Sequence, residues 1–154
     1  GNMSFHCEDC SAHHFAETVY QTHQVIILPP VEFIKEFPDE DVTIHIDRMR
    51  LTQVITNFLG NAKKFTSQGH IKLGYFCDKE KKEIHFFVED TGAGIPKEEL
   101  QMIFERFYKR NEFVQGVGLG LAISKVIVEK MNGHIDVQSE VNKGSRFTAV
   151  LPYL

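Results

Sequence analysis

The longest regular pattern in the sequence is an apolar stripe at helical spacing between residues 50 and 65. Its positions follow the i, i+3, i+4, i+7 rule for one face of a helix. Shortly before it stands Asp47, whose carboxylate suits a helix N-cap. We therefore predict a helix over residues 50–65 with one face in the core. That face consists of Leu51, Val54, Ile55, Phe58, Leu59, Ala62 and Phe65.

A second stripe on the same helix is polar. Asn57, Asn61 and Lys64 are spaced i, i+4 and i+7, so they stack along one side. Exposed helix faces more often carry Glu and Lys, and asparagine is a poor residue for the middle of a helix. Either the stripe is ordinary surface polarity, or its two carboxamides and its ammonium group contact something beside the helix.

Shorter patterns predict the remaining elements. Apolar, β-branched or alternating runs bounded by turn residues predict strands at 3–7, 31–37, 42–46, 71–76, 84–90, 134–139 and 145–151. Helical spacing predicts a first helix capped near Asp9 or Ser11, a short amphipathic helix at 97–106, and an apolar helix at 119–131. We expect strands 31–37 and 42–46 to form a hairpin, and strands 71–76 and 84–90 to flank a charged turn.

Composition narrows the class of protein. The 154 residues fit one domain, residues 1–154, in which Gly1 looks like a remnant of tag cleavage. A net charge of −4 argues against a nucleic-acid surface. The sequence shows neither a signal peptide nor an apolar run as long as a membrane span. Three cysteines, an odd number, favour a reducing compartment, and hence the cytoplasm, over a disulfide scaffold.

A cluster near the N-terminus has partial metal-site spacing. Cys7 and Cys10 are separated by two residues, and His13 and His14 follow closely. No second Cys or His pair follows at the spacing of a zinc finger. We favour a structural role for these residues beside a capped helix, and the sequence leaves open whether the cluster binds a metal.

The strand predicted at 84–90 ends in a carboxylate followed by glycines. The sequence Asp90-Thr91-Gly92-Ala93-Gly94 allows a tight backbone excursion. A carboxylate at a strand end can accept a hydrogen bond from the exocyclic amine of a planar heterocycle, and glycines would let its ring approach the backbone. By itself, the D-x-G-x-G pattern is more often only a turn.

A second glycine group leads into the predicted helix at 119–131. Gly116, Gly118 and Gly120 form a G-x-G-x-G pattern at its start. Glycines before a helix N-terminus present unpaired amides and the positive end of the dipole, which suits an anion. The spacing is neither that of the dinucleotide fingerprint nor that of a Walker loop. The alternative is a flexible loop. Upstream, residues 104–110 combine three aromatic and three cationic residues.

An Asn-rich helix, a D-x-G-x-G turn, an F-x-R-F segment and a G-x-G-x-G loop thus occur in this order. The set resembles the ATP-binding catalytic domain of bacterial sensor histidine kinases, in the superfamily that includes gyrase-type ATPases. The resemblance covers about residues 31–154. It implies an α/β two-layer sandwich of the Bergerat type, with one mixed sheet, three main helices on one face, and ATP between helices and sheet.

The resemblance also implies roles for the polar stripe. Asn61 matches the asparagine that ligates the Mg²⁺ bridging the ATP phosphates, and Asn57 matches the polar residue one turn earlier near that metal. Carboxamide oxygens suit a hydrated Mg²⁺ whose charge is balanced by phosphates. Lys64 matches a lysine that contacts phosphate, and Phe65 matches the aromatic residue that packs on the base.

For the two glycine segments, Asp90 matches the aspartate that recognises the adenine amino group, with Gly92, Gly94 and Ile95 beside the ring. The phosphate loop after the lid would comprise Gly116, Gly118, Leu119, Gly120 and Leu121. Three cations, Arg106, Lys109 and Arg110, are candidates for contacting the γ-phosphate at transfer. Only residues 109–115 separate the aromatic segment from the glycines, so the lid is shorter than in many relatives.

Asn57 separates two classes within the superfamily. Hydrolytic members carry a glutamate there to polarise water, and a carboxamide cannot act as that base. We therefore expect phosphoryl transfer to a histidine on a separate dimerisation domain, with a response regulator downstream and no nucleic-acid partner. The chain contains no acceptor motif of the H-[DE]-apolar-R-x-P type, so we expect an excised, monomeric catalytic domain. The parent protein could be membrane-anchored. Alternatives are a hydrolytic ATPase or a degenerate regulatory nucleotide-binding module.

Overall fold

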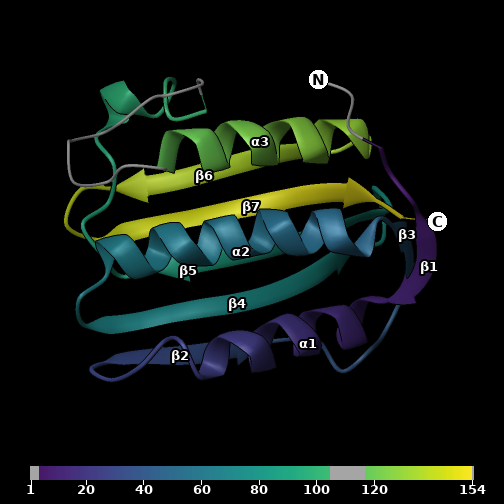
Figure 1. Cartoon of the computed structure of the whole chain (residues 1–154), viewed down its shortest axis with the longest axis horizontal. Helices are drawn as coiled ribbons and strands as arrows, with labels where there is room; N and C mark the ends of the chain where they lie inside the picture. The colour runs from purple at the N-terminus through teal and green to yellow at the C-terminus, as the bar shows by residue number, and fades with distance from the viewer. Residues whose placement is uncertain (1–3, 105–116, 154) are drawn as a thin grey trace.

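The computed structural model describes residues 4–104 and 117–153. Three helices lie over one face of a five-stranded sheet (Figure 1). The helices are α1 (Ala12–Gln24), α2 (Arg48–Phe65) and α3 (Val117–Lys130). The sheet order is β2-β4-β5-β7-β6, and its strands are β2 (Val31–Glu36), β4 (Gly69–Asp78), β5 (Glu83–Asp90), β6 (His134–Glu140) and β7 (Gly144–Pro152).

The sheet is mixed, as predicted. Strand β2 runs parallel to β4, and every other neighbouring pair in it is antiparallel. A parallel pair needs a long crossover connection, and the segment that contains α2 supplies it. The two-layer arrangement of helices on a mixed sheet confirms the predicted fold class.

The predicted hairpin of strands 31–37 and 42–46 is wrong. Strand β3 (Thr43–Ile46) does not pair with β2 but forms a separate antiparallel ribbon with β1 (Glu8–Ser11). Ile44 and Ile46 on β3 are buried in the hydrophobic core, so apolar contacts hold this strand in place without β2 as a partner. The local pattern indicated the strands correctly but contained no information about their partners.

Most other elements differ from their predicted bounds by one to three residues, and two differ more. The first strand lies at Glu8–Ser11 and not at 3–7, because Ser11 ends it by capping α1: the hydroxyl of Ser11 accepts a bond from the His14 amide at 3.0 Å. The helix predicted at 97–106 is a single 3₁₀ turn, Lys97–Glu99, followed by turns up to residue 104. Ile103 is buried by these turns, which satisfy the apolar spacing without the cost of nucleating a long helix. Residues 105 and 106 of that prediction lie outside the described part.

Helix α2 matches its prediction closely. Asp47 caps it, since its carboxylate accepts a hydrogen bond from the Arg50 amide at 3.1 Å. The predicted apolar face is buried from Leu51 to Ala62, and Phe65 at its end is partly buried. Phe58 meets Phe147 of β7 with ring centroids 5.4 Å apart. This contact places α2 over the middle of the sheet.

The N-terminal cysteine cluster forms no evident metal centre. Within residues 4–104 and 117–153, no group of three or more His, Cys, Asp or Glu side chains is arranged to hold a metal ion. Cys7 is exposed, and partial burial raises the pKa of the Cys10 thiol. The described part of the chain also contains no helix that is long and apolar enough to cross a membrane.

Candidate functional site

Three of the predicted polar segments meet at one end of the sheet. The C-terminal end of α2, the end of β5 and the first turn of α3 lie together there (Figure 1). The amide of Ala93 donates to the carbonyl oxygen of Phe65 at 3.2 Å, which ties the segment after β5 to the end of α2. Asn57 Nδ2 donates to the carbonyl oxygen of Gly120 at 3.1 Å, which ties α2 to α3. Residues far apart in the sequence thus form one site.

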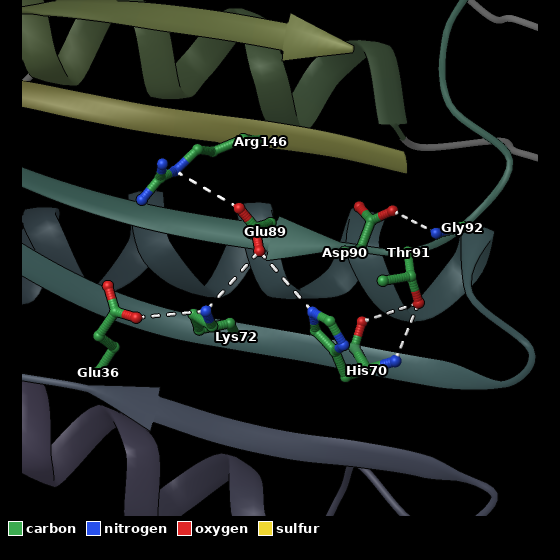
Figure 2. A network of polar contacts seen from close by, with 8 residues as sticks. All are labelled: Glu36, His70, Lys72, Glu89, Asp90, Thr91, Gly92 and Arg146. Atoms are coloured by element: carbon green, nitrogen blue, oxygen red, sulfur yellow. Dashed lines mark hydrogen bonds and ion pairs between the residues drawn. The ribbon is translucent and has the colours of Figure 1, made fainter. Parts of the chain in front are cut away.

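Asp90 is the buried carboxylate of this site. It ends β5, and only 5% of its surface is exposed. The amide of Gly92 donates to its Oδ1 at 2.8 Å (Figure 2). Burial raises the pKa of Asp90, while the backbone amides of Gly92 and Ser145 and the Thr66 hydroxyl act in the opposite direction. The carboxyl group is therefore held in a fixed orientation by amide donors inside the protein.

Gly92 and Gly94 are required by the chain's own backbone. A Cβ atom on Gly92 would collide with the carbonyl oxygen of Phe65. Gly94 has φ +75°, and a Cβ there would collide with the carbonyl oxygen of Glu140, the last residue of β6. We expected these glycines to make room for a ligand ring. Packing inside the protein already requires them, because the loop is clamped between α2 and the strand end at Glu140; the expectation of a ligand ring beside them stays a prediction.

We predict that Gly94→Ala lowers the free energy of unfolding by about 2–4 kcal/mol, because the left-handed φ and the collision with Glu140 act together. Urea denaturation measures this. Gly60→Ala is the matched control: Gly60 lies in α2, no heavy atom stands within 4 Å of the place that a Cβ would take there, and alanine in a helix should stabilise by up to about 1 kcal/mol. Equal effects of the two substitutions would contradict the clamp.

Asn61 has a buried amide nitrogen that the protein does not satisfy. The residue is 7% exposed, and its Nδ2 has no hydrogen-bond partner among the described residues. The Thr66 hydroxyl is also buried, but it acts on the Asp90 carboxyl, whose pKa it lowers. Leaving a buried group such as the Asn61 amide unpaired is costly, so it needs an explanation. An unpaired amide nitrogen near the end of α2, at the end of the sheet that carries Asp90, fits a site that receives a polar group from a ligand.

Asn57 is placed differently from Asn61. Its Nδ2 donates both to Gly120 and, at 3.0 Å, to the hydroxyl of Ser124, which is fully buried in α3. The carboxamide nitrogen is therefore committed to joining α2 and α3, and its oxygen is the atom left for other contacts. Nothing in the sequence marks Ser124 as a residue of the site, since a single serine within an apolar helix is common.

The other predicted site residues differ in burial, and some lie outside the described part of the chain. Lys64 is exposed in the last turn of α2, and Phe65 is partly buried against the core. Ile95 and Leu121 are buried in the apolar core. Gly118 and Leu119 lie in the first turn of α3, but their side-chain surroundings are outside the described residues. Arg106, Lys109, Arg110 and Gly116 lie outside the described residues altogether.

Thr91, beside Asp90, is a residue that sequence reasoning missed. Its hydroxyl accepts a bond from the His70 amide at 2.9 Å (Figure 2). Its own amide donates to the His70 carbonyl oxygen at 3.1 Å. These bonds extend the pairing of β4 and β5 by one residue beyond Asp90. The start of the loop is therefore as well fixed as the strand.

A charged network lies on the sheet face opposite α2 (Figure 2). Glu89 faces His70 at 3.7 Å, Lys72 at 4.0 Å and Arg146 at 4.0 Å. Lys72 also pairs with Glu36 at 3.2 Å. These pairs are long and partly exposed, so each contributes little to stability. Because neighbouring residues of a strand point to opposite faces, Glu89 lies behind the sheet while Asp90 faces the helices.

Known proteins resemble this chain in sequence. The Bacillus subtilis sensor histidine kinase WalK is 38% identical over 128 residues, which cover 80% of this chain and 21% of WalK. The Staphylococcus aureus sensor protein SrrB is 44% identical over 110 residues, which cover 69% of this chain and 19% of SrrB. The chain thus spans about a fifth of the length of these relatives.

Solved structures agree with the sequence comparison. The nucleotide-free catalytic domain of histidine kinase ThkA superposes with a TM-score of 0.85 and 28% identity, covering 97% of each chain. Full-length ShkA in complex with AMPPNP gives a TM-score of 0.88 and 27% identity over 99% of this chain and 32% of ShkA. Residues 46–154 match the family described as histidine kinase-, DNA gyrase B- and HSP90-like ATPases. Since that match covers more than half of the sequence, the chain belongs to this ATPase family, with the fold of histidine kinase catalytic domains.

Proposed function

We propose that this chain is the catalytic domain of a sensor histidine kinase, which binds ATP with Mg²⁺ and transfers the γ-phosphoryl group to a histidine of a separate dimerisation domain. The buried, amide-held carboxylate of Asp90, together with the unpaired amide nitrogen of Asn61, is the observation that carries the proposal. In two-component signalling the phosphoryl group then passes to a response regulator. Because the reaction uses ATP, we also propose a cytoplasmic location for the domain.

Recognition of the base rests on Asp90. Its carboxylate oxygens accept hydrogen bonds only, so they suit the exocyclic amine of adenine and oppose the carbonyl oxygen that guanine has at the same place. The Thr66 hydroxyl, which lowers the pKa of Asp90, is a second buried polar group on this side. The site should therefore prefer ATP to GTP.

Phosphate and metal binding rest on α2. A metal site fits the residues present, because Asn61 offers a carboxamide oxygen of the kind that Mg²⁺ accepts. Its buried amide nitrogen, which has no partner among the described residues, could donate to a phosphate oxygen beside the metal. When bound, Mg²⁺ neutralises charge on the phosphates. Asn57 would direct its free oxygen toward the same side, and Lys64 would contact phosphate. Arg106, Lys109 and Arg110 stay candidates for the γ-phosphate.

The geometry of Asn57 favours transfer over hydrolysis. Its amide nitrogen is bonded to α3, and a carboxamide cannot take a proton from water. The position where a hydrolytic relative needs a base is therefore occupied by a structural contact. The nucleophile has to come from another domain.

We expect the isolated chain to bind ATP in a Mg²⁺-dependent manner and to show almost no turnover alone. Calorimetric titration of ATP with and without Mg²⁺ measures the first point. Release of labelled γ-phosphate by the isolated chain measures the second, and its transfer to an added dimeric histidine-acceptor hairpin provides the comparison. Absence of binding at millimolar ATP would contradict the kinase hypothesis. Robust hydrolysis by the isolated chain that Asp90→Asn abolishes would favour an ATPase.

A further inference from the structure

The segment from Asp90 to Ile95, here named the Asp90 loop, rests on the turn between β6 and β7. The carbonyl oxygen of Ala93 accepts a bond from the Asn142 amide at 2.7 Å. Gly94 lies directly against the carbonyl of Glu140, as described above. Gly144 likewise lacks a side chain where a Cβ would collide with the carbonyl oxygen of Asp90. The β6–β7 turn and the strand ends beside it therefore contact the loop at Asp90, Ala93 and Gly94 through backbone atoms.

One side chain takes part in this contact. The Ile95 amide donates to the hydroxyl oxygen of Ser139 at 2.7 Å. Ser139 lies on β6 directly opposite Ser145 of β7, and Ser145 lies opposite Asp90 of β5. The three side chains form a row across three strands on the face that the helices cover. Ser139 thus bonds the far end of the loop and stands in the same row as its first residue.

The number of hydroxyl protons determines which serine donates and which accepts in this row. The Ser139 oxygen lies 2.7 Å from the Ser145 oxygen and 3.1 Å from the carbonyl oxygen of Gly144. A hydroxyl has one proton and two acceptor sites. All contacts are satisfied only if Ser139 donates to Gly144 and accepts from both Ile95 and the Ser145 hydroxyl. The Ser145 proton is then used, while its backbone amide bonds the Asp90 carboxyl and lowers that group's pKa against the effect of burial.

We propose that Ser139 is a positioning residue for nucleotide recognition: it locks the two ends of the Asp90 loop together and so fixes the direction of the Asp90 carboxylate. This inference rests on the proposed function, since it concerns the same site. Ser139 does not need to touch the nucleotide. It acts through Ser145 at one end of the loop and through the Ile95 amide at the other.

Ser139→Ala tests the proposal. Loss of these bonds should weaken ATP and ADP binding alike, by about tenfold, and should reduce the preference for ATP over GTP. Ser139→Thr keeps the hydroxyl and should restore affinity to within about twofold. Ser67→Ala, a substitution at an exposed serine after α2, should leave affinity and preference unchanged. Titrations with Mg²⁺ present measure all four proteins well below their melting temperatures.

The readouts separate positioning from general stability. A merely structural role would lower the melting temperature without changing the ATP-to-GTP ratio. If Ser139→Ala does not fold, Ser139→Cys replaces it, because the thiol has a similar volume but is a much weaker acceptor. Independently of any variant, the proposal requires slow hydrogen exchange of the Ile95 amide in the wild type. Wild-type affinity and preference in Ser139→Ala, no rescue by threonine, or rapid exchange at Ile95 would each overturn the proposal. Failure of the wild type itself to bind ATP would instead overturn the proposed function.

Discussion

Asp90→Asn should lower the affinity for ATP by at least about a hundredfold. The substitution keeps one oxygen, which can still accept the Gly92 amide, but replaces the other with an amide nitrogen. That nitrogen donates where the adenine amine also donates, so a hydrogen bond becomes a repulsion in a buried site. Titration of ATP and GTP against both proteins measures the effect. The preference for ATP should disappear together with the affinity.

The same substitution should not destabilise the nucleotide-free protein at neutral pH. Burial raises the pKa of Asp90 above its unfolded value, so ionised Asp90 is less favourable in the folded chain. Between the usual carboxyl pKa and this raised pKa, the folded state binds more protons than the unfolded state. This group's contribution to stability therefore decreases as pH rises through that window and is constant above it.

Asn carries no charge at any of these pH values. Asp90→Asn should thus be at least as stable as the wild type at pH 7. The difference should narrow as pH falls from the raised pKa of Asp90 to the usual carboxyl pKa of about 4, and it should be constant below that. Urea denaturation of both proteins across this range provides the measurement. A variant that is less stable than the wild type by the same amount at every pH would contradict this. It would show that Asp90 stabilises the fold, whereas we expect its ionised carboxylate to lower stability and to serve nucleotide binding.

Local periodicity predicted the elements of this fold well. The apolar face of α2 and its cap at Asp47 follow from side chains that are close in sequence, so the sequence contains the required information. The pairing of β2 and β3 with distant strands does not follow in this way. The pairing of Val31 with Gly69 depends on how the whole chain folds back, and any strand pattern is compatible with several partners.

The candidate site was predictable where a residue type is unusual for its element. Asn61 is out of place in a helix interior, and Asp90 is out of place at a buried strand end. Ser139 and Ser124 were not predictable, because a serine in a strand or an apolar helix is common. Their importance comes from hydrogen bonds to residues 44 positions (Ser139 to Ile95) and 67 positions (Ser124 to Asn57) away.

Asn61→Ala should abolish the contribution of Mg²⁺ to ATP binding and slow phosphoryl transfer by at least about a hundredfold. The variant loses the proposed metal ligand and leaves Asp90 intact, so ATP without Mg²⁺ should bind both proteins equally. Since the Asn61 amide nitrogen is buried without a partner among the described residues, its removal should change the free energy of unfolding by less than about 1 kcal/mol. Paired titrations with and without Mg²⁺, together with urea denaturation, measure both effects.

Asn57→Ala is the matched comparison, because it removes a carboxamide one turn earlier on the same helix. Its Nδ2 bonds Gly120 and the buried hydroxyl of Ser124, so the substitution should cost about 1–3 kcal/mol of stability. The two substitutions should therefore differ in their effects. Asn61→Ala should reduce metal-dependent binding with little change in stability, whereas Asn57→Ala should lower stability as well. If Asn61→Ala kept the full gain in affinity from Mg²⁺, the metal would have to be held by other residues, and the unpaired amide would need a different ligand.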